Sequence, residues 1–417
     1  MFTRRTFLRF VAGGSAAWLN PAIRAQVGGQ REGGGEKGSL LNDAATWREF
    51  RAAMAKRPGS AAVLGREADQ WLHSGLITVV HKKTPGPTGD PHDYVSLAPY
   101  RWPDPGKPDG LPWIDRDGQV NPVFYDYDNP DLERLCRAVP WLLLHAEAAG
   151  SLPHARRAGR LLRAWFLDPE TRMNPHLRFA QKVPGLADGT PGGIIDTTSL
   201  VFLADAASRL AFNADWTAAH LAGVKEWFGR YVDWLLTSEA GQKEGSAMNN
   251  HGSWYDAQVA SFAVFADRPE IARRQVERMT LLRLASQVEP DGRQPAELRR
   301  TLALTYSTYN LLAHACTAQV VAPLGIDLWG WKSPDGRSLR GALNWLLPYL
   351  AKEQEWKFPQ IHAFDFTSAA VLLNLAAQRT GDANVVRVGD LITEHPWQRL
   401  AFSKASIAGR EVPRPRK

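Results

Sequence analysis

The chain has 417 residues, of which 44% are hydrophobic and 22% are charged, and this composition is that of a globular protein, not of a disordered one. Its net charge of +7 is mild and spread along the chain, and it is compatible with a polyanionic ligand. Zinc-finger spacing, an RNP-like aromatic motif and a basic-region helix are all missing from the sequence, so nucleic acid is not an expected partner.

The N-terminal stretch TRRTFLRFVAGGSAAWLNPAIRAQ is typical of a twin-arginine export signal. It carries the pair Arg4 and Arg5, then a modest apolar region and small residues. A Gly-Gly-Ser run interrupts the apolar region, which is too short to span a bilayer, and no later segment approaches a membrane span. We therefore expect residues 1–25 to be removed and the mature protein to be periplasmic or secreted, with no membrane partner.

The rest of the chain divides into a linker and one domain. Residues 26–44 begin with a Gly-rich run and are predicted to be a linker, and residues 45–417 are predicted to form the domain. The two cysteines, Cys136 and Cys316, lie far apart in apolar segments. This placement indicates core residues and favours neither a disulfide nor a zinc site.

Helical periodicity recurs from about residue 45 onward, with apolar residues three and four positions apart. The clearest segments are residues 131–150, 154–168, 197–212, 217–239, 254–268, 270–288, 305–324, 339–351 and 365–382. Short loops rich in Gly, Pro and Asp separate most of them, and no alternating pattern is long enough for a sheet domain. Helix pairs in series can form a solenoid or an α/α toroid, and the lack of a fixed-period repeat disfavours a regular solenoid.

Two long irregular segments interrupt the helices. Residues 82–129 are rich in Pro, Asp and Tyr, and residues 173–195 are rich in Gly and Pro. Irregular segments of this length in a compact domain are usually functional, so we expect them at the rim of the helical domain, beside a binding site.

Four stretches combine polar and aromatic side chains in a way that helix packing does not require. They are PHDYVSLAPYRWPDPGKPDGLPWIDRDGQVNP, MNPHLRFAQKVPG, NNHGSWYD and PAELRRTLALTYSTYN. In this order and combination they resemble the alginate lyase superfamily of polysaccharide lyases, which includes mannuronate and glucuronan lyases. The resemblance covers roughly residues 75–370.

The resemblance implies an all-α fold, an (α/α) toroid or incomplete α/α barrel with long rim loops. It also implies a polysaccharide lyase that cleaves a uronic-acid polymer, alginate or glucuronan, by β-elimination and yields 4,5-unsaturated uronates. The expected partner is thus an anionic polysaccharide. No cofactor is expected, and no His, Cys and carboxylate set has metal-ligand spacing. Which uronan is cut, endo or exo action and the oligomeric state stay open.

The reaction removes the C5 proton beside a carboxylate, so that carboxylate must be neutralised as negative charge develops. The resemblance implies that Tyr306 takes the proton, and that Asn250 and His251 hold the carboxylate together with one arginine. A tyrosine base needs nearby positive charge, because its ordinary pKa is about 10. If the helix is continuous, Arg299 lies nearer the face that carries Tyr306. The family pattern instead favours Arg300. Both arginines are therefore candidates, and Arg300 is preferred. His251 is the alternative base, for guluronate.

Further side chains are candidates for contact with the sugar. They are Tyr94, Tyr100, Trp102, His176, Gln181, Asn249, Trp254, Tyr255 and His362. Loop packing explains the aromatic residues of the first stretch as well as sugar stacking does. A satisfied core histidine explains His362 equally well, and Asn249 is expected to cap a helix that begins near Ser253.

Two rival functions remain. An α/α-toroid glycoside hydrolase needs a pair of acidic side chains across its cleft. Its candidates are Asp196, Asp256, Glu297 and Asp365, and nothing in the sequence pairs them. The other rival is a non-catalytic periplasmic protein that binds polysaccharide; against it, every residue type that the elimination needs is present.

Overall fold

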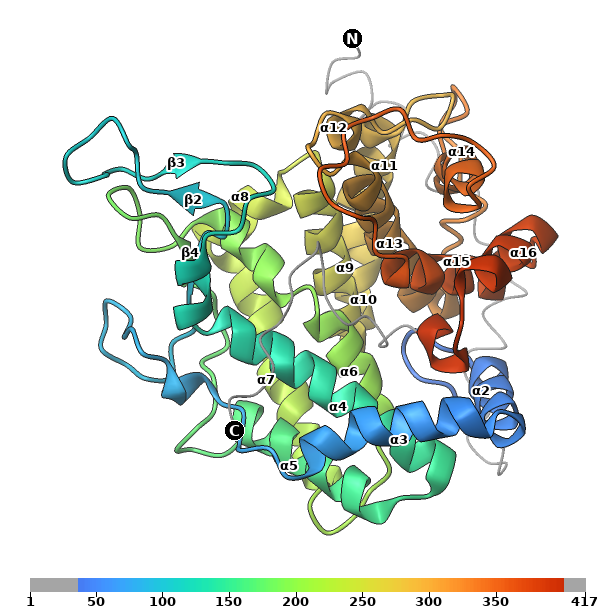
Figure 1. Ribbon diagram of the computed structural model, residues 1–417, viewed down its shortest axis with the longest axis horizontal. Coiled ribbons are helices and arrows are strands. Elements are labelled where there is room, and N and C mark those ends of the chain that lie inside the picture. Colours follow the sequence, from blue (N-terminus) through green and yellow to red (C-terminus); the bar gives the residue numbers. More distant parts are fainter. Residues whose placement is uncertain (1–36, 401–417) are drawn as a thin grey trace. The chain divides into compact units, whose positions relative to one another are not determined.

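The computed structural model describes residues 37–400 (Figure 1), so the expected export signal and the first part of the expected linker lie outside the described residues. The folded unit begins at Gly38, earlier than the expected domain start. The backbone N–H of Leu41 and Nδ2 of Asn42 donate to the buried carboxylate of Asp205 at 2.6 and 2.8 Å. These last residues of the expected linker are therefore packed into the domain.

The first helices form one layer at the base of the unit (Figure 1), and local sequence signals define their ends. The carboxylate of Asp43 accepts a hydrogen bond from the N–H of Thr46 and caps α2, and Gly150, with φ of 65°, ends α4. Helices α3 and α5 both pack against α4. The bounds are Ala44–Lys56 for α2, Pro58–Leu72 for α3, Asn129–Ala149 for α4 and Leu152–Phe166 for α5.

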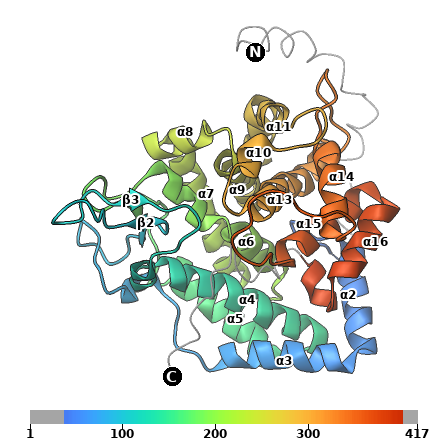
Figure 2. The same cartoon turned by 45° about the horizontal axis from the view of Figure 1, so that its top comes forward.

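Two helices pack against each other in the middle of the unit, α9 (Asn250–Phe265) and α13 (Ala303–Val321). All residues of α13 except Thr305 are buried, and α9 is almost as enclosed, although both helices carry several polar side chains. Helices α6 (Leu200–Arg209), α7 (Ala218–Thr237) and α10 (Pro269–Gln275) pack on α9, while α15 (Thr367–Thr380) packs on α13 (Figure 2). Both cysteines are buried and no disulfide joins them, as predicted.

The segments predicted to be helical are helical, and the fold is an α/α toroid that does not close into a barrel. The predicted helix over 270–288 is continuous but contains a π-helical turn, Val276–Thr280, between α10 and α11. The remaining helices are α8 (Glu239–Gly245), α11 (Leu281–Gln287), α12 (Pro295–Leu298), α14 (Leu339–Leu350) and α16 (Ala383–Ile392). No helix between residues 37 and 400 is long and apolar enough to cross a membrane.

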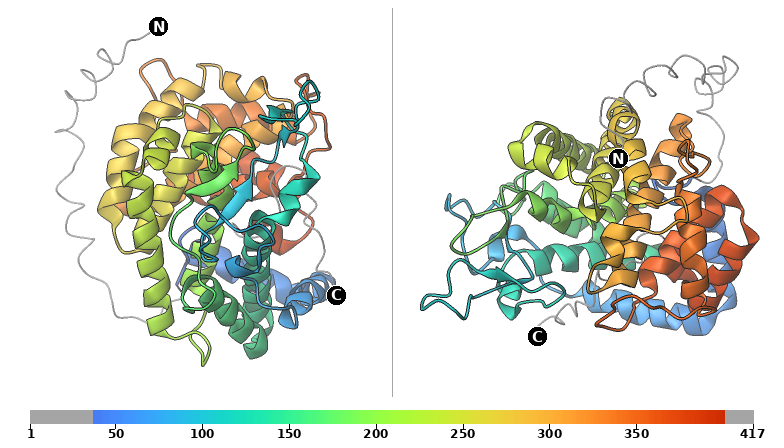
Figure 3. Two further views of the ribbon diagram at one scale, coloured as in Figure 1. Left: turned by 90° about the vertical axis from the view of Figure 1, so that its left-hand side faces the viewer. Right: turned by 90° about the horizontal axis from the view of Figure 1, so that it is seen from above.

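The two long irregular segments lie together at one end of the unit (Figure 3). Strand β1 (Val95–Leu97), from the first segment, pairs in parallel with β4 (Phe179–Lys182), from the second. A short hairpin of β2 (Arg101–Trp102) and β3 (Ile114–Asp115) extends from the first segment. This pairing brings two rim segments that are distant in the sequence to the same side of the toroid.

Candidate active site

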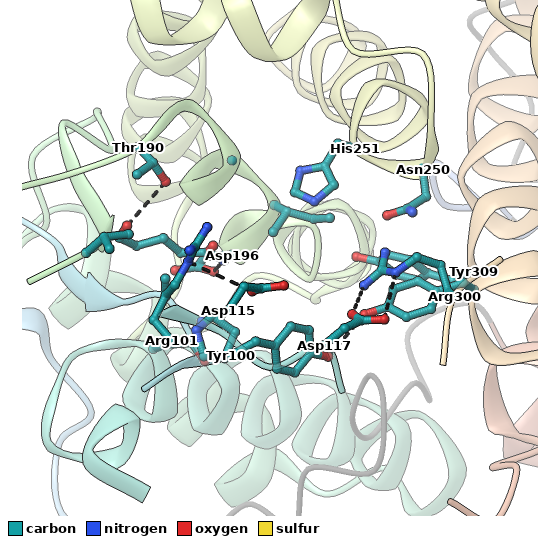
Figure 4. Close-up of a pocket in the computed structure, with 18 of the residues that line it drawn as sticks. Tyr100, Arg101, Asp115, Asp117, Thr190, Asp196, Asn250, His251, Arg300 and Tyr309 are labelled. Atoms are coloured by element: carbon teal, nitrogen blue, oxygen red, sulfur yellow. Dashed lines mark hydrogen bonds and ion pairs between the residues drawn. The ribbon is translucent and has the colours of Figure 1, made fainter. Parts of the chain in front are cut away.

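A cleft of about 370 Å³ opens where the two rim segments meet the first turns of α9 and α13 (Figure 4). Asn250, His251, Arg300 and Tyr306 all line it, although they come from two separate stretches of the chain. The structure therefore brings together four of the five residues expected to be catalytic.

Tyr306 lies in the first turn of α13, and only 7% of its surface is exposed. Its hydroxyl shares a hydrogen bond of 3.1 Å with the hydroxyl of Tyr100, and the guanidinium carbon of Arg300 lies 3.7 Å from the centre of its ring. Burial and the neighbouring Tyr100 raise the pKa of Tyr306 well above 10, while the positive charge of Arg300 opposes this shift. The phenol is therefore neutral in this substrate-free state.

The two adjacent arginines face different surroundings. Helix α12 ends at Leu298 and α13 begins at Ala303, so no continuous helix joins Arg299 to Tyr306. Arg299 is exposed and lines a separate surface depression, and the expectation that it faces Tyr306 is corrected. Arg300 is the arginine in the cleft.

Arg300 is held by an acid that sequence reasoning missed. Its Nη2 and Nε atoms donate to the carboxylate of Asp117 at 2.5 and 3.2 Å. Burial pushes the pKa of Asp117 upward, but its hydrogen bonds and its charge interaction with Arg300 keep that pKa below 3.8. In the sequence, Asp117 belongs to an Asp-Gly turn signal, which carries no hint of a partner 183 positions away.

Helix α9 begins at Asn250, three residues earlier than expected, because Asn249 caps it by accepting the N–H of His251 at 3.2 Å. The predicted capping role of Asn249 is confirmed. The backbone N–H and Nδ2 of Asn250 donate to the buried carboxylate of Glu297 at 2.8 and 2.7 Å. The amide donor expected to contact a substrate carboxylate is therefore already engaged by Glu297. Within residues 37–400, the Oδ1 atom of Asn250 is buried and has no hydrogen-bond partner.

His251 is oriented by a second buried acid that the sequence did not reveal. Its Nδ1 lies 2.6 Å from Oε1 of Glu244, which is 5% exposed. With Nδ1 engaged, the Nε2 atom is the ring nitrogen left for a ligand, and Figure 4 shows the ring beside the open cleft. Gly192 lies beside the ring, and a Cβ there would be in ordinary van der Waals contact with Cε1 of His251, at 3.5 Å.

Gln181 lines the cleft, as expected of a contact residue, and is fixed by its neighbours. Its Nε2 donates to Oδ1 of Asp196 at 2.7 Å, and its backbone has a positive φ of 50°. The other carboxylate oxygen of Asp196 accepts from Ser96 Oγ and Tyr94 OH, at 2.5 and 3.2 Å. Tyr94 is fully buried behind Asp196, so it supports the cleft wall and does not line it. Tyr100 lines the cleft directly.

Three other predicted contact residues from loops lie outside this cleft. Trp102 donates from Nε1 to the carbonyl of Gln119 at 2.9 Å, a loop-packing role. His176 lies 3.2 Å from the buried carboxylate of Asp93, where it joins the two rim segments. His362 is exposed and is not part of the cleft lining.

Trp254 and Tyr255 were also predicted to contact substrate, and their burial in α9 corrects this. Trp254 is 0% exposed, with its ring 4.7 Å from that of Tyr309. Tyr255 donates its hydroxyl to the carbonyl of Leu235 at 2.8 Å. Both lie about one turn after the cleft residues Asn250 and His251 on the same helix. They are therefore further from the cleft and lie in the core.

The four acids of the rival hydrolase do not converge. Asp196 lines the cleft, whereas Glu297 lies behind it and holds Asn250. Asp256 is fully buried and is paired with Arg283, and Asp365 is exposed. Between residues 37 and 400, no group of three or more His, Cys, Asp or Glu side chains is arranged to hold a metal ion.

Comparison with known proteins identifies the family to which the chain is similar. The model of the family named Alginate lyase matches residues 78–356. The chain is similar to the crystal structure of an alginate lyase from Bacteroides ovatus, with a TM-score of 0.82 and 34% identity over 89% of this chain and 100% of that chain.

More distant structures share the fold. Alginate lyase A1-III from Sphingomonas species A1 has a TM-score of 0.51 and 18% identity, over 84% of this chain and 93% of that chain. A variant of alginate lyase A1-III complexed with a tetrasaccharide has a TM-score of 0.51 and 17% identity, over 81% and 90% of the two chains. No curated protein matches the chain. On the family match and on the similarity to the Bacteroides ovatus structure, the chain belongs to the alginate lyase family.

Proposed function

We propose that this protein is a polysaccharide lyase that cleaves a uronic-acid polymer by β-elimination. The observation that carries the proposal is the meeting of a tyrosine hydroxyl, a guanidinium and an imidazole in one cleft, from Tyr306, Arg300 and His251. Alginate is the first substrate to test, because the similar solved structures are alginate lyases. Glucuronan is the second, since its C5 hydrogen and C4 oxygen have the same relative orientation as those of polymannuronate.

In the proposed reaction, Arg300 and His251 bind the carboxylate of the sugar whose C5 proton is removed. Tyr306 takes that proton, the C5–H electron pair forms the C4–C5 double bond, and the C4–O bond breaks. On mannuronate or glucuronate both groups lie on one ring face, so Tyr306 can return the proton to the leaving oxygen. On guluronate they lie on opposite faces, and the Nε2 atom of His251, fixed by Glu244, is the alternative base.

The test is incubation of the purified protein with polymannuronate, polyguluronate, glucuronan and a neutral glucan. A C4–C5 double bond conjugated to a carboxylate absorbs in the ultraviolet, and an increase with a uronan but not with the glucan is the expected result. New reducing ends without this absorbance would instead identify a hydrolase. Binding with neither signal would identify a polysaccharide-binding protein.

The raised pKa of Tyr306 predicts the pH dependence of this reaction. Burial and Tyr100 keep the side chain neutral, and only its phenolate can accept the C5 proton. Below that pKa, kcat/KM is expected to rise about tenfold for each pH unit as the phenolate fraction grows. Initial rates from neutral to alkaline pH measure this slope, and a kcat/KM that is constant over the range would argue against Tyr306 as the base.

Replacing Glu297 with Gln is expected to lower KM. The amide oxygen of the substituted side chain can still accept the backbone N–H of Asn250, while its NH₂ group favours Oδ1 of Asn250 and turns Nδ2 toward the cleft. The cleft then presents a donor to the substrate carboxylate and loses a negative charge beside it. The gain in affinity is expected to be about tenfold, the value of one hydrogen bond to a charged group.

Initial rates over a range of uronan concentrations measure this KM. Replacing Glu297 with Ala is the matched comparison, because Ala leaves the N–H of Asn250 without its acceptor. A KM that rises equally in both variants would show that the carboxylate of Glu297 is itself required.

We also propose that residues 1–25 are a cleaved export signal, that a short linker follows, and that the lyase domain occupies the rest of the chain. The paired arginines of the N-terminal stretch support this proposal. N-terminal sequencing of the protein recovered from the periplasm or medium tests it, and an intact N-terminus in the cytoplasm would contradict it.

A further inference from the structure

Asp117 follows directly after the hairpin of β2 and β3 and ties its end to the chain just before α13. Its carboxylate accepts four hydrogen bonds: two from Arg300, at 2.5 and 3.2 Å, and two from the N–H and Oγ1 of Thr301, at 3.2 and 2.9 Å. The next residue, Gly118, has φ of 78°, and a Cβ there would lie 2.8 Å from Thr301 Oγ1. Glycine is therefore needed at position 118 for the turn to approach Thr301 this closely.

The contact also sets the direction of Arg300. Asp117 occupies the edge of the guanidinium formed by Nε and Nη2, and the plane lies over the ring of Tyr306 at 3.7 Å. Nη1 makes no hydrogen bond to a residue in the described part of the chain, 37–400, so the end of the guanidinium remains for a ligand in the cleft. Figure 4 shows Asp117 on one side of Arg300, with His251 and Asn250 on the opposite side.

Asp117 can act on the reaction in two ways, by orienting Arg300 or through its own negative charge. The two ways predict different kinetic effects when Asp117 is removed. An arginine without such a partner samples many rotamers in the substrate complex, and ordering it again costs free energy each time the transition state forms. The negative charge of Asp117 also offsets that of Arg300, which weakens the attraction of the cleft for an anionic polymer. If Asp117 acts by orienting Arg300, its removal lowers kcat. If it acts through its charge alone, its removal lowers KM.

We propose that Asp117 is a positioning residue for the elimination, which holds the guanidinium of Arg300 against Tyr306 and directs its free end to the substrate carboxylate. This inference rests on the proposed lyase function. It assigns to the rim hairpin a role in the chemistry, because the hairpin supplies the acid that orients the arginine.

The test replaces Asp117 with Asn, which keeps the shape and can still accept from Thr301. We expect kcat to fall about 100-fold, the loss typical of a misplaced catalytic group, with KM unchanged or lower. The control is Asp109→Asn on the same hairpin. Asp109 is exposed and, among residues 37–400, accepts only the N–H of Leu111, so the kcat of this variant is expected to stay within about threefold of the wild type.

A double-mutant cycle with Arg300→Lys shows whether Asp117 acts through Arg300. In the Arg300→Lys background, Asp117→Asn is expected to change kcat by less than about threefold, because Lys cannot form the two-bonded contact. Equal losses in both backgrounds, with a lower melting temperature, would overturn the inference in favour of a structural role. Thr301→Val, which removes only a hairpin contact, is expected to keep most of kcat.

Failure of this inference and failure of the proposed function give different results. If the wild-type protein forms no unsaturated product from any uronan, the lyase function itself is wrong. If the wild type is active and Asp117→Asn has an unchanged kcat, only the positioning role is wrong.

Discussion

Replacing Tyr306 with Phe is expected to lower kcat on the preferred uronan about 1000-fold, the contribution of a combined general base and acid. The substitution removes the hydroxyl that is proposed to take the C5 proton and return it to the leaving oxygen. The ring remains, so its contact with Arg300 is kept, and the lost hydrogen bond is the one to Tyr100. Ultraviolet absorbance of the product measures kcat, and circular dichroism establishes that the variant is folded.

Tyr309→Phe is the matched control. Tyr309 lies on the same helix, lines the same cleft and donates its hydroxyl to Thr198 Oγ1 at 3.2 Å, away from Tyr306. Its kcat is expected to stay within about threefold of the wild type. Normal turnover by Tyr306→Phe would remove Tyr306 from the mechanism and make His251 the leading candidate for the base.

Replacing Asp256 with Ala is expected to lower the free energy of unfolding by about 3–5 kcal/mol, the cost of breaking a buried ion pair on one side. Asp256 accepts from Nε and Nη2 of Arg283 at 2.9 and 3.1 Å, and both side chains are 0% exposed. Arg283 also donates to the carbonyls of Gly245 and Ala247, just before α9. Without Asp256 its charge stays buried and uncompensated.

Urea unfolding followed by circular dichroism measures this loss. Asp365→Ala is the control: Asp365 is exposed, and the loss of its two hydrogen bonds from Thr367 at the start of α15 is expected to lower the free energy of unfolding by no more than about 1 kcal/mol. The same pair tests the hydrolase alternative, in which Asp256 was a candidate acid. A variant of unchanged stability that has lost all activity would contradict the structural role of Asp256.

The helical part of the fold was predictable because its signals are local. The 3.6-residue pattern predicted most of the long helices, and Asn249 was correctly expected to cap α9. Helices α2, α3 and α16 were not among the predicted segments. Helices α8 and α12 were also not predicted individually, since seven and four residues are too few for a periodic pattern. The break between α12 and α13 separates Arg299 from the cleft. It depends on where the short helix α12 ends.

The candidate site was predicted in part, through the order of its motifs. Asn250, His251, Arg300 and Tyr306 do meet in one cleft, whereas Trp254 was wrongly placed there. Helix α9 is buried along almost its whole length and carries both polar and apolar side chains, so its pattern does not indicate how far along the helix the cleft extends. Trp254 lies one turn after Asn250 on the same face and is already in the core, and this depth depends on which helices pack around α9.

The sequence by itself determined the helical class, the buried cysteines, the capping of α9 and the residue types that an elimination requires. These properties depend on neighbours within one or two helical turns. Only the tertiary structure decided that Asp117 holds Arg300 and that Glu297 engages the amide of Asn250, across 183 and 47 positions. Such contacts form when packing brings distant segments together, and a carboxylate in a loop has the same local pattern whether or not an arginine lies opposite it in the fold.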